Sequence, residues 1–106
     1  MVTIKSYQDK DIFTMFPKDK DVEVPLLKVL LELGGEGKSR DIISLLTKRF
    51  PKITKKELEK NLLTGDNKWE TRIDFVKFIL ITKGEIDFPR LNLWSITDKG
   101  RKRVNQ

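Results

Sequence analysis

The sequence predicts a mainly α-helical domain with a small β-hairpin. Apolar residues recur at helical spacing in three segments between residues 24 and 65, and in a longer fourth segment at 68–83. Alternating apolar residues on both sides of Pro89 then indicate a hairpin. The runs of buried strand residues that a parallel βαβ fold needs are missing from this pattern. The order of elements is typical of a winged helix-turn-helix.

The first two predicted helices each end at a helix breaker. Pro25 suits the first helical position of the first helix, which ends at Gly34. The second helix follows Ser39, a predicted N-cap, and ends at Pro51. The apolar side chains of both helices share one face and are expected in the core: Leu27, Leu30, Leu31, Ile42, Leu45, Leu46 and Phe50.

The third and fourth predicted helices carry clear start signals. Thr54 and Glu57 form a capping box at the start of a short third helix, and Asn67 is a predicted N-cap for the fourth. One stripe of the fourth helix is apolar and expected in the core: Trp69, Ile73, Val76 and Leu80. The N-terminal half of this helix is expected to be exposed, as in a recognition helix. The C-terminal half is expected to be buried on most sides, because residues 78–81 are all apolar.

The hairpin is predicted to turn at Pro89-Arg90, with a return strand over residues 91–96. Pro89 cannot donate a ladder hydrogen bond, so it belongs at the turn or at a sheet edge. Thr97 is a predicted cap for a terminal helix that carries a short basic tail. The glycine-rich residues 34–38 are interpreted as a turn.

Residues 1–23 are predicted to be a partly ordered N-terminal arm, and residues 24–106 the domain itself. The charges of the arm alternate in sign, and no helical period is sustained there. Its apolar residues either pack against their own domain or dock a partner: Ile12, Phe13, Met15 and Phe16.

The composition restricts the chemistry of this chain. Its 106 residues suffice for one core, and they include no cysteine and no histidine. Zinc fingers, thiol catalysis and the commonest general base are therefore excluded, and we predict no cofactor and no metal. No leader or membrane-spanning run is recognised, which favours the cytoplasm. The net charge of +6 suits a polyanionic partner, although many basic proteins merely solvate their lysines.

Four sequence pieces, in order, resemble the N-terminal winged-helix domain of Mrr-type restriction endonucleases, with similar spacing over residues 24–104. They are Val24-Pro25-Leu26-Leu27 with Leu33-Gly34-Gly35-Glu36, Trp69-Glu70-Thr71-Arg72-Ile73, Thr82-Lys83-Gly84, and Pro89-Arg90 with Trp94-Ser95-Ile96-Thr97-Asp98-Lys99-Gly100. In that family this module is thought to bind DNA, and a separate C-terminal domain cuts it. The resemblance therefore implies a DNA-binding winged helix.

A nuclease site is not expected within this chain. Glu36-Gly37-Lys38 and Asp66-Asn67-Lys68 match the short carboxylate-x-lysine pattern of such nucleases. The first lies in the predicted turn and the second at a helix start, and neither follows the acidic strand that a metal site needs. We therefore expect no enzymatic activity from this chain alone, which is either an excised domain or a stand-alone binder.

Phosphate contacts are expected from the predicted second and third helices. Residues 38–56 hold seven lysines or arginines and one aspartate, whereas residues 1–23 carry a net charge of −1. Basic side chains in such a region position a protein on the DNA backbone. Free N–H groups beside Lys55 and Lys56 would act as a phosphate clamp. The phosphate candidates are Lys38, Arg40, Lys55 and Lys56.

Base contacts are expected from the exposed start of the fourth helix, with Arg90 at the wing tip. Glu70 and Asp74 on this helix either point away from DNA or accept from cytosine amino groups. A salt bridge is the alternative for Arg72, and a plain turn residue the alternative for Arg90. The base-reading candidates are Asn67, Lys68, Thr71, Arg72, Phe75 and Lys77, whereas Trp69 and Trp94 are predicted to be core residues.

The predicted function is duplex-DNA binding, without catalysis, by a domain of a restriction or DNA-defence protein, through helix 68–83 and the wing around Arg90. Whether the target DNA carries modified bases is left open by the sequence. One alternative is a protein-interaction or dimerisation module, which Glu70, Asp74 and the aromatic arm would favour. The others are a stand-alone transcriptional regulator and, least favoured, an independent nuclease. A homodimer and an attached nuclease domain or subunit are the protein partners left open, and no membrane partner is expected.

Overall fold

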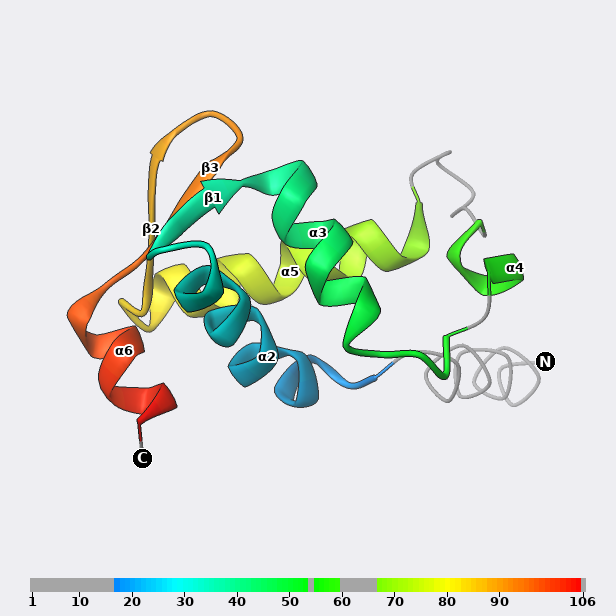
Figure 1. Ribbon diagram of the computed structural model, residues 1–106, viewed down its shortest axis with the longest axis horizontal. Helices are drawn as coiled ribbons and strands as arrows, with labels where there is room; N and C mark the ends of the chain where they lie inside the picture. Colours follow the sequence, from blue (N-terminus) through cyan, green and yellow to red (C-terminus); the bar gives the residue numbers. More distant parts are fainter. Residues whose placement is uncertain (1–16, 54, 60–66, 106) are drawn as a thin grey trace, which may run out of the picture.

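The computed structural model describes residues 17–53, 55–59 and 67–105, apart from the side chains of residues 56 and 57 (Figure 1). Helices α4 and α6 lie at opposite ends of the molecule. The elements, in chain order, are α2 (Asp19–Glu32), β1 (Glu36–Lys38), α3 (Ser39–Lys48), α4 (Lys55–Leu58), α5 (Lys68–Thr82), β2 (Ile86–Arg90), β3 (Leu93–Ile96) and α6 (Asp98–Val104).

The three strands form one antiparallel sheet in the order β1-β3-β2. The chain is mainly helical with a small sheet, as predicted, and its arrangement is compatible with a winged helix-turn-helix. The prediction of a turn at residues 36–38 is wrong, because these residues form β1, in which Gly37 faces Trp94 of β3. Pairing with a strand almost sixty residues away is not visible in a three-residue pattern.

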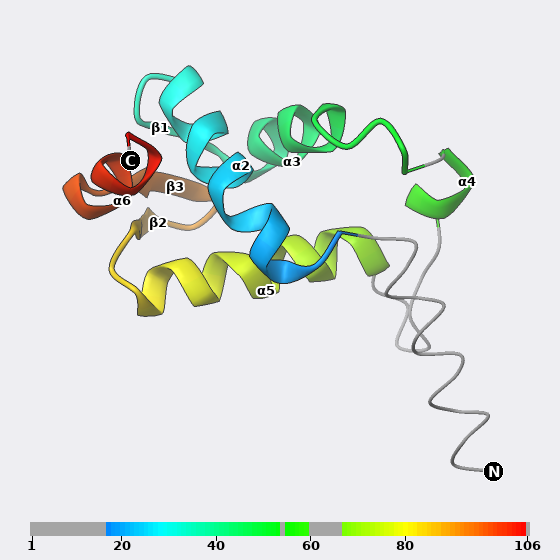
Figure 2. The same cartoon turned by 90° about the horizontal axis from the view of Figure 1, so that it is seen from below.

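The core lies between α2, α3, α5 and the sheet. Figure 2 shows α2 between α3 on one side and α5 on the other. Trp69 and Trp94 are both buried, so their prediction as core residues is confirmed. The Trp69 indole N–H donates to the Thr47 hydroxyl at 2.9 Å, and its ring meets Phe50 edge-on. The main buried stripe of α5 is the predicted one: Trp69, Ile73, Val76 and Leu80.

The start of α2 differs from the prediction. The helix begins at Asp19, so residues 19–23, which the sequence assigns to the arm, are helical and Pro25 lies inside the helix. Burial of Val22 in the core and the favourable position of Asp19 near the positive end of the helix outweigh the hydrogen bond that Pro25 cannot donate. Residues 1–16 lie outside the described residues, and the proposed division at residue 23 stays a prediction.

Two of the predicted helix N-caps are confirmed and one is wrong. The Asn67 side chain accepts from the Glu70 N–H at 3.0 Å, and the Thr97 hydroxyl accepts from the Gly100 N–H at 3.1 Å, so both caps are confirmed. The predicted N-cap role of Ser39 is wrong by one position, because Lys38 precedes the first helical residue. The capping box at the start of α4 lies outside the described residues and side chains.

The hairpin turns two residues later than predicted. Arg90 ends β2 and faces Leu93, so the turn consists of Leu91 and Asn92. Asn92 has a φ of 63°, a left-handed conformation that asparagine tolerates better than most residues. Pro89 lies beside a register shift in β2, one of the two edge strands, which confirms its expected place at an edge.

The C-terminal half of α5 is not buried on most sides, contrary to the prediction. Phe78 is 60% exposed, and Phe75, about one turn before it, is 56% exposed. The helix lies on the outside of the domain, so α2 and the sheet cover only one of its faces. Its outer face is therefore partly aromatic.

An ion cluster joins α2, α6 and the loop before β2. Arg103 donates to Glu23 at 2.8 Å and to Glu85 at 2.6 Å, and Lys83 donates to Glu23 at 2.7 Å. Burial of the Glu23 carboxylate acts to raise its pKa, but the hydrogen bonds and charges of Lys83 and Arg103 outweigh burial and hold the pKa below its ordinary value of 4.5. This cluster fixes α6 to the domain.

The depressed pKa of Glu23 leads to a prediction about acid stability. The carboxylate contributes stability at pH values above its unfolded pKa, and this contribution is lost as the pH falls through its lower folded pKa. We expect the urea concentration at the unfolding midpoint to decrease as the pH is lowered below the ordinary value of 4.5. Glu23→Gln should be less stable at neutral pH and show a smaller pH dependence; an unchanged dependence would exclude Glu23 as a source.

Candidate nucleic-acid interface

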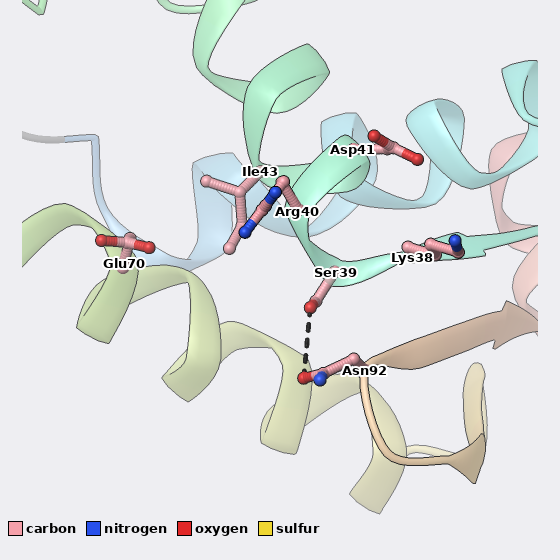
Figure 3. A pocket seen from close by; sticks show the side chains of 7 residues that line it. All are labelled: Lys38, Ser39, Arg40, Asp41, Ile43, Glu70 and Asn92. Atoms are coloured by element: carbon pink, nitrogen blue, oxygen red, sulfur yellow. Dashed lines mark hydrogen bonds between the residues drawn. The ribbon is translucent and has the colours of Figure 1, made fainter.

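Three elements meet around an open hollow of about 610 Å³ (Figure 3). They are the N-terminus of α3, the first turn of α5 and the turn of the β2–β3 hairpin. The hollow is lined by Lys38, Ser39, Arg40, Asp41, Ile43, Glu70 and Asn92.

Hydrogen bonds between Ser39 and Asn92 fix the hairpin turn against α3. The Ser39 backbone N–H donates to the Asn92 carbonyl at 2.9 Å, and the Ser39 hydroxyl donates to the Asn92 side-chain oxygen at 3.4 Å. The β1–β3 ladder ends beside them, where Lys38 faces Leu93. The start of α3 and the β2–β3 hairpin, which is the wing expected from the sequence, are thus one connected unit.

Lys38 and Arg40 give this unit its positive charge. Both side chains are exposed, and neither has an ion-pair partner among the described residues. No side chain caps the N-terminus of α3, so the helix dipole adds to their positive potential. Asp41 and Glu70 reduce it at the rim. The hollow suits a phosphate oxygen near Lys38 and Arg40 more than near Glu70.

Several predicted base-reading residues have partners within the chain. Asn67 caps α5, and its amide also donates to the Leu58 carbonyl at 2.6 Å. The Thr71 hydroxyl donates to the Asn67 carbonyl at 2.7 Å, although Thr71 is exposed. Arg72 donates to Asp19 of α2 at 2.7 Å, the salt bridge that was the alternative from sequence. These contacts stabilise the start of α5.

Lys77 is enclosed between α5 and the wing. Its side chain is 12% exposed, and its ammonium group lies 4.7 Å from the ring centre of Phe88, 4.9 Å from that of Phe78 and 5.0 Å from that of Trp94. The Asp74 carboxylate is 4.0 Å away. Lys77 is therefore a contact between α5 and the wing, rather than an outward-pointing cation.

We expect Lys77→Ala to lower the free energy of unfolding by about 1–2 kcal/mol, because it removes the cation–π contacts and the packing of the aliphatic stem. Denaturant titration followed by tryptophan fluorescence measures this loss. Lys28→Ala, at an exposed position of α2, is the matched control and should change stability little. Equal effects of both variants would contradict this role for Lys77.

The remaining predicted residues are dispersed. Arg90 is exposed at the end of β2, beside the hairpin turn, and Phe75 is exposed on α5, whereas Lys68 is half-buried at the start of α5. Lys55 is exposed on α4, which lies far from the hairpin, and the side chain of Lys56 is outside the described residues. The sequence reasoning missed Ser39 and Asn92 as lining residues; asparagine's preference for hairpin turns was the available signal for the latter.

Among the described residues, no group of three or more aspartates or glutamates could hold a metal ion. None of the helices described in the structure has the length and apolar character needed to cross a membrane.

Fold and site together define a small, mainly helical domain with a basic hollow between a helix N-terminus and a hairpin. The family model of the Mrr N-terminal domain matches residues 20–106, and the chain belongs to this family, as its sequence pieces indicate. Membership of this family supports a domain of a restriction-type protein. The family model describes an N-terminal domain and not a nuclease domain. Neither the comparison with curated proteins nor the comparison with solved structures gives a match.

Proposed function

We propose that this chain is a non-catalytic winged-helix domain that binds duplex DNA for a restriction or DNA-defence protein. The observation that carries the proposal is the junction of α3, α5 and the hairpin turn, with Lys38 and Arg40 exposed around one hollow. In a winged helix these are the parts that meet the phosphate backbone and the grooves. Membership of the Mrr N-terminal domain family supports the same conclusion.

Phosphate binding is assigned to the basic side chains around the hollow and the wing. The domain would be positioned on the DNA backbone by Lys38, Arg40 and Arg90. Additional phosphate contacts would come from Lys55 and Lys56 on α4. Such contacts contribute affinity without reading sequence. Salt dependence of binding is therefore the direct property to measure.

Base reading is assigned to the exposed first half of α5. Its outer side presents Glu70, Thr71 and Asp74, and carboxylates accept hydrogen bonds from cytosine amino groups in the major groove. Arg72 and Lys77 are not included in this proposal, because Asp19 and the aromatic rings hold them. Phe75 is left out as well, because it lies about 140° from Glu70 around the helix axis.

The deciding experiment is a titration of labelled duplexes with the purified chain at low and at higher salt. Duplexes with and without modified cytosine or adenine are compared in parallel. We expect binding that weakens linearly in a plot of log affinity against log salt. Absence of binding to every duplex at low salt would refute the proposal.

Arg90→Ala is expected to weaken duplex binding by about three- to tenfold at low salt and to lower the salt slope by about 1, as the loss of one phosphate contact would. Lys55→Ala with Lys56→Ala should act in the same direction. Lys102→Ala in α6 serves as the control, because it removes one positive charge at an exposed position away from the wing. Unchanged affinity in the Arg90 variant would mean that the wing does not reach DNA.

Cleavage is left to another domain in this proposal. A nuclease domain in the same polypeptide or in a second subunit would act on the DNA that this domain holds in the cytoplasm. Copurification of DNA cleavage with the purified chain alone, in the presence of divalent metal ions, would contradict this division of labour.

A further inference from the structure

The outer face of α5 carries an apolar strip that the DNA-binding proposal hardly uses. Phe75, Phe78, Ile79 and Thr82, with the stem of Lys83, line a shallow groove of about 280 Å³. Its lining is almost entirely apolar, and both phenylalanines are more than half exposed. An exposed apolar strip of this kind marks a surface on which another segment or a partner can dock.

The strip lies on the side of α5 that is next to α2. Along an α-helix, positions 72, 75, 79 and 83 follow one another on one stripe. The two ends of this stripe are bonded to α2, Arg72 to Asp19 and Lys83 to Glu23. Figure 2 shows the start of α2 beside α5. The strip therefore begins about one helical turn from the point where the described chain enters α2.

The residues immediately before α2 are those of the apolar cluster found in the sequence. They lie outside the described residues, and the described chain starts at Pro17, two residues before Asp19. Five extended residues span up to about 17 Å. The strip from Phe75 to Lys83 is about 12 Å long. The cluster thus has the length, the anchoring point and the apolar character to cover the strip: Ile12, Phe13, Met15 and Phe16.

We propose that residues 12–16 dock on the apolar strip of α5 within the same chain. Transfer of the phenyl and aliphatic side chains from water to the groove favours this contact. The ordering cost is limited, because the salt bridge between Asp19 and Arg72 already holds the adjoining residues against α5.

The docked segment and the basic hollow occupy different sides of α5. Glu70, which lines the hollow, and Phe75, which lines the strip, are about 140° apart around the helix axis. The docking proposal does not depend on DNA binding, and each can fail without the other.

Crosslinking of the full chain tests the docking, since the chain has no cysteine of its own. Thr14→Cys is combined with Thr82→Cys in the strip, and the protein is treated with a short bismaleimide at low protein concentration. The control combines Thr14→Cys with Glu70→Cys, which is nearer to Arg72 along α5 but lies on the other side of the helix. We expect the intramolecular crosslink to form several-fold more in the Thr82 pair than in the Glu70 pair.

Two results would overturn the proposal. Equal crosslinking of both pairs, or more in the Glu70 pair, would show a segment that is not docked on the strip. Crosslinks formed only between two chains would show that a second copy covers the strip instead.

A thermal-stability comparison provides an independent readout. Phe16→Ala and Phe75→Ala are each expected to lower the melting temperature, and the double variant should lose less than the two single losses together, because they remove one contact. Phe16→Ala combined with Leu91→Ala, in the exposed hairpin turn, should be additive. Additive losses for the Phe16 and Phe75 pair would contradict the contact.

Discussion

Replacing Arg103 with methionine is expected to lower the free energy of unfolding by about 2–4 kcal/mol, somewhat less than removal of a fully buried ion-pair partner. Arg103 is the only described basic residue that bonds to both Glu23 and Glu85, whose side chains are 6% and 8% exposed. Methionine keeps most of the side-chain volume but removes the charge and the donors. Lys83 still neutralises Glu23, whereas Glu85 loses its ion-pair partner among the described residues.

Urea denaturation followed by tryptophan fluorescence measures this loss, with Lys102→Met at an exposed neighbouring position as the control. The control should be nearly neutral. A second substitution, Glu85→Gln, should recover part of the stability in the methionine background, because an amide is less costly to bury without a partner than a carboxylate. Failure of Glu85→Gln to help would place the origin of the loss elsewhere.

Local signals predicted much of the fold because their causes are local. The caps at Asn67 and Thr97 and the buried stripe of α5 depend on residues three or four positions apart, so the sequence shows them directly. The start of α2 was harder. Pro25 is favoured at the first helical position by its own geometry, but burial of Val22 and the contact of Asp19 with Arg72 extend the helix before it.

Contacts between distant residues were beyond the sequence. Strand β1 exists because it pairs with β3, and the end of α3 nearest the wing is fixed by the bonds of Ser39 to Asn92, 53 residues away. The hairpin prediction placed the turn at Pro89-Arg90, so it did not bring Asn92 to the site. Without that position, the hollow between α3 and the wing could not be inferred.

The charged residues of the site show the same limit. Lys38 and Arg40 were predicted from charge density, and the structure leaves both exposed. Helical periodicity placed Lys77 on the polar side of α5, but it gave no information about the rings of Phe88 and Trp94 that enclose its ammonium group. A lysine on the polar side of a helix is therefore available to DNA only if no neighbouring element covers it.

Reversing the charge of Lys38 and Arg40 together is the strongest test of the proposed interface. We expect Lys38→Glu with Arg40→Glu to weaken duplex binding on the order of 100-fold at low salt and to lower the salt slope by about 2, because two attractive phosphate contacts become repulsive. Fluorescence anisotropy with a labelled duplex at several salt concentrations measures both quantities. Circular dichroism of the variant verifies that the fold is kept, since both side chains are exposed.

The matched control is Lys99→Glu with Lys102→Glu in α6, which lowers the net charge by the same amount at exposed positions outside the hollow. Net charge alone would weaken binding equally in both double variants, through the long-range potential of the whole chain. A local interface would weaken it much more in the Lys38 and Arg40 variant. Equal losses would therefore exclude the hollow between α3, α5 and the wing as the place where the DNA backbone is held.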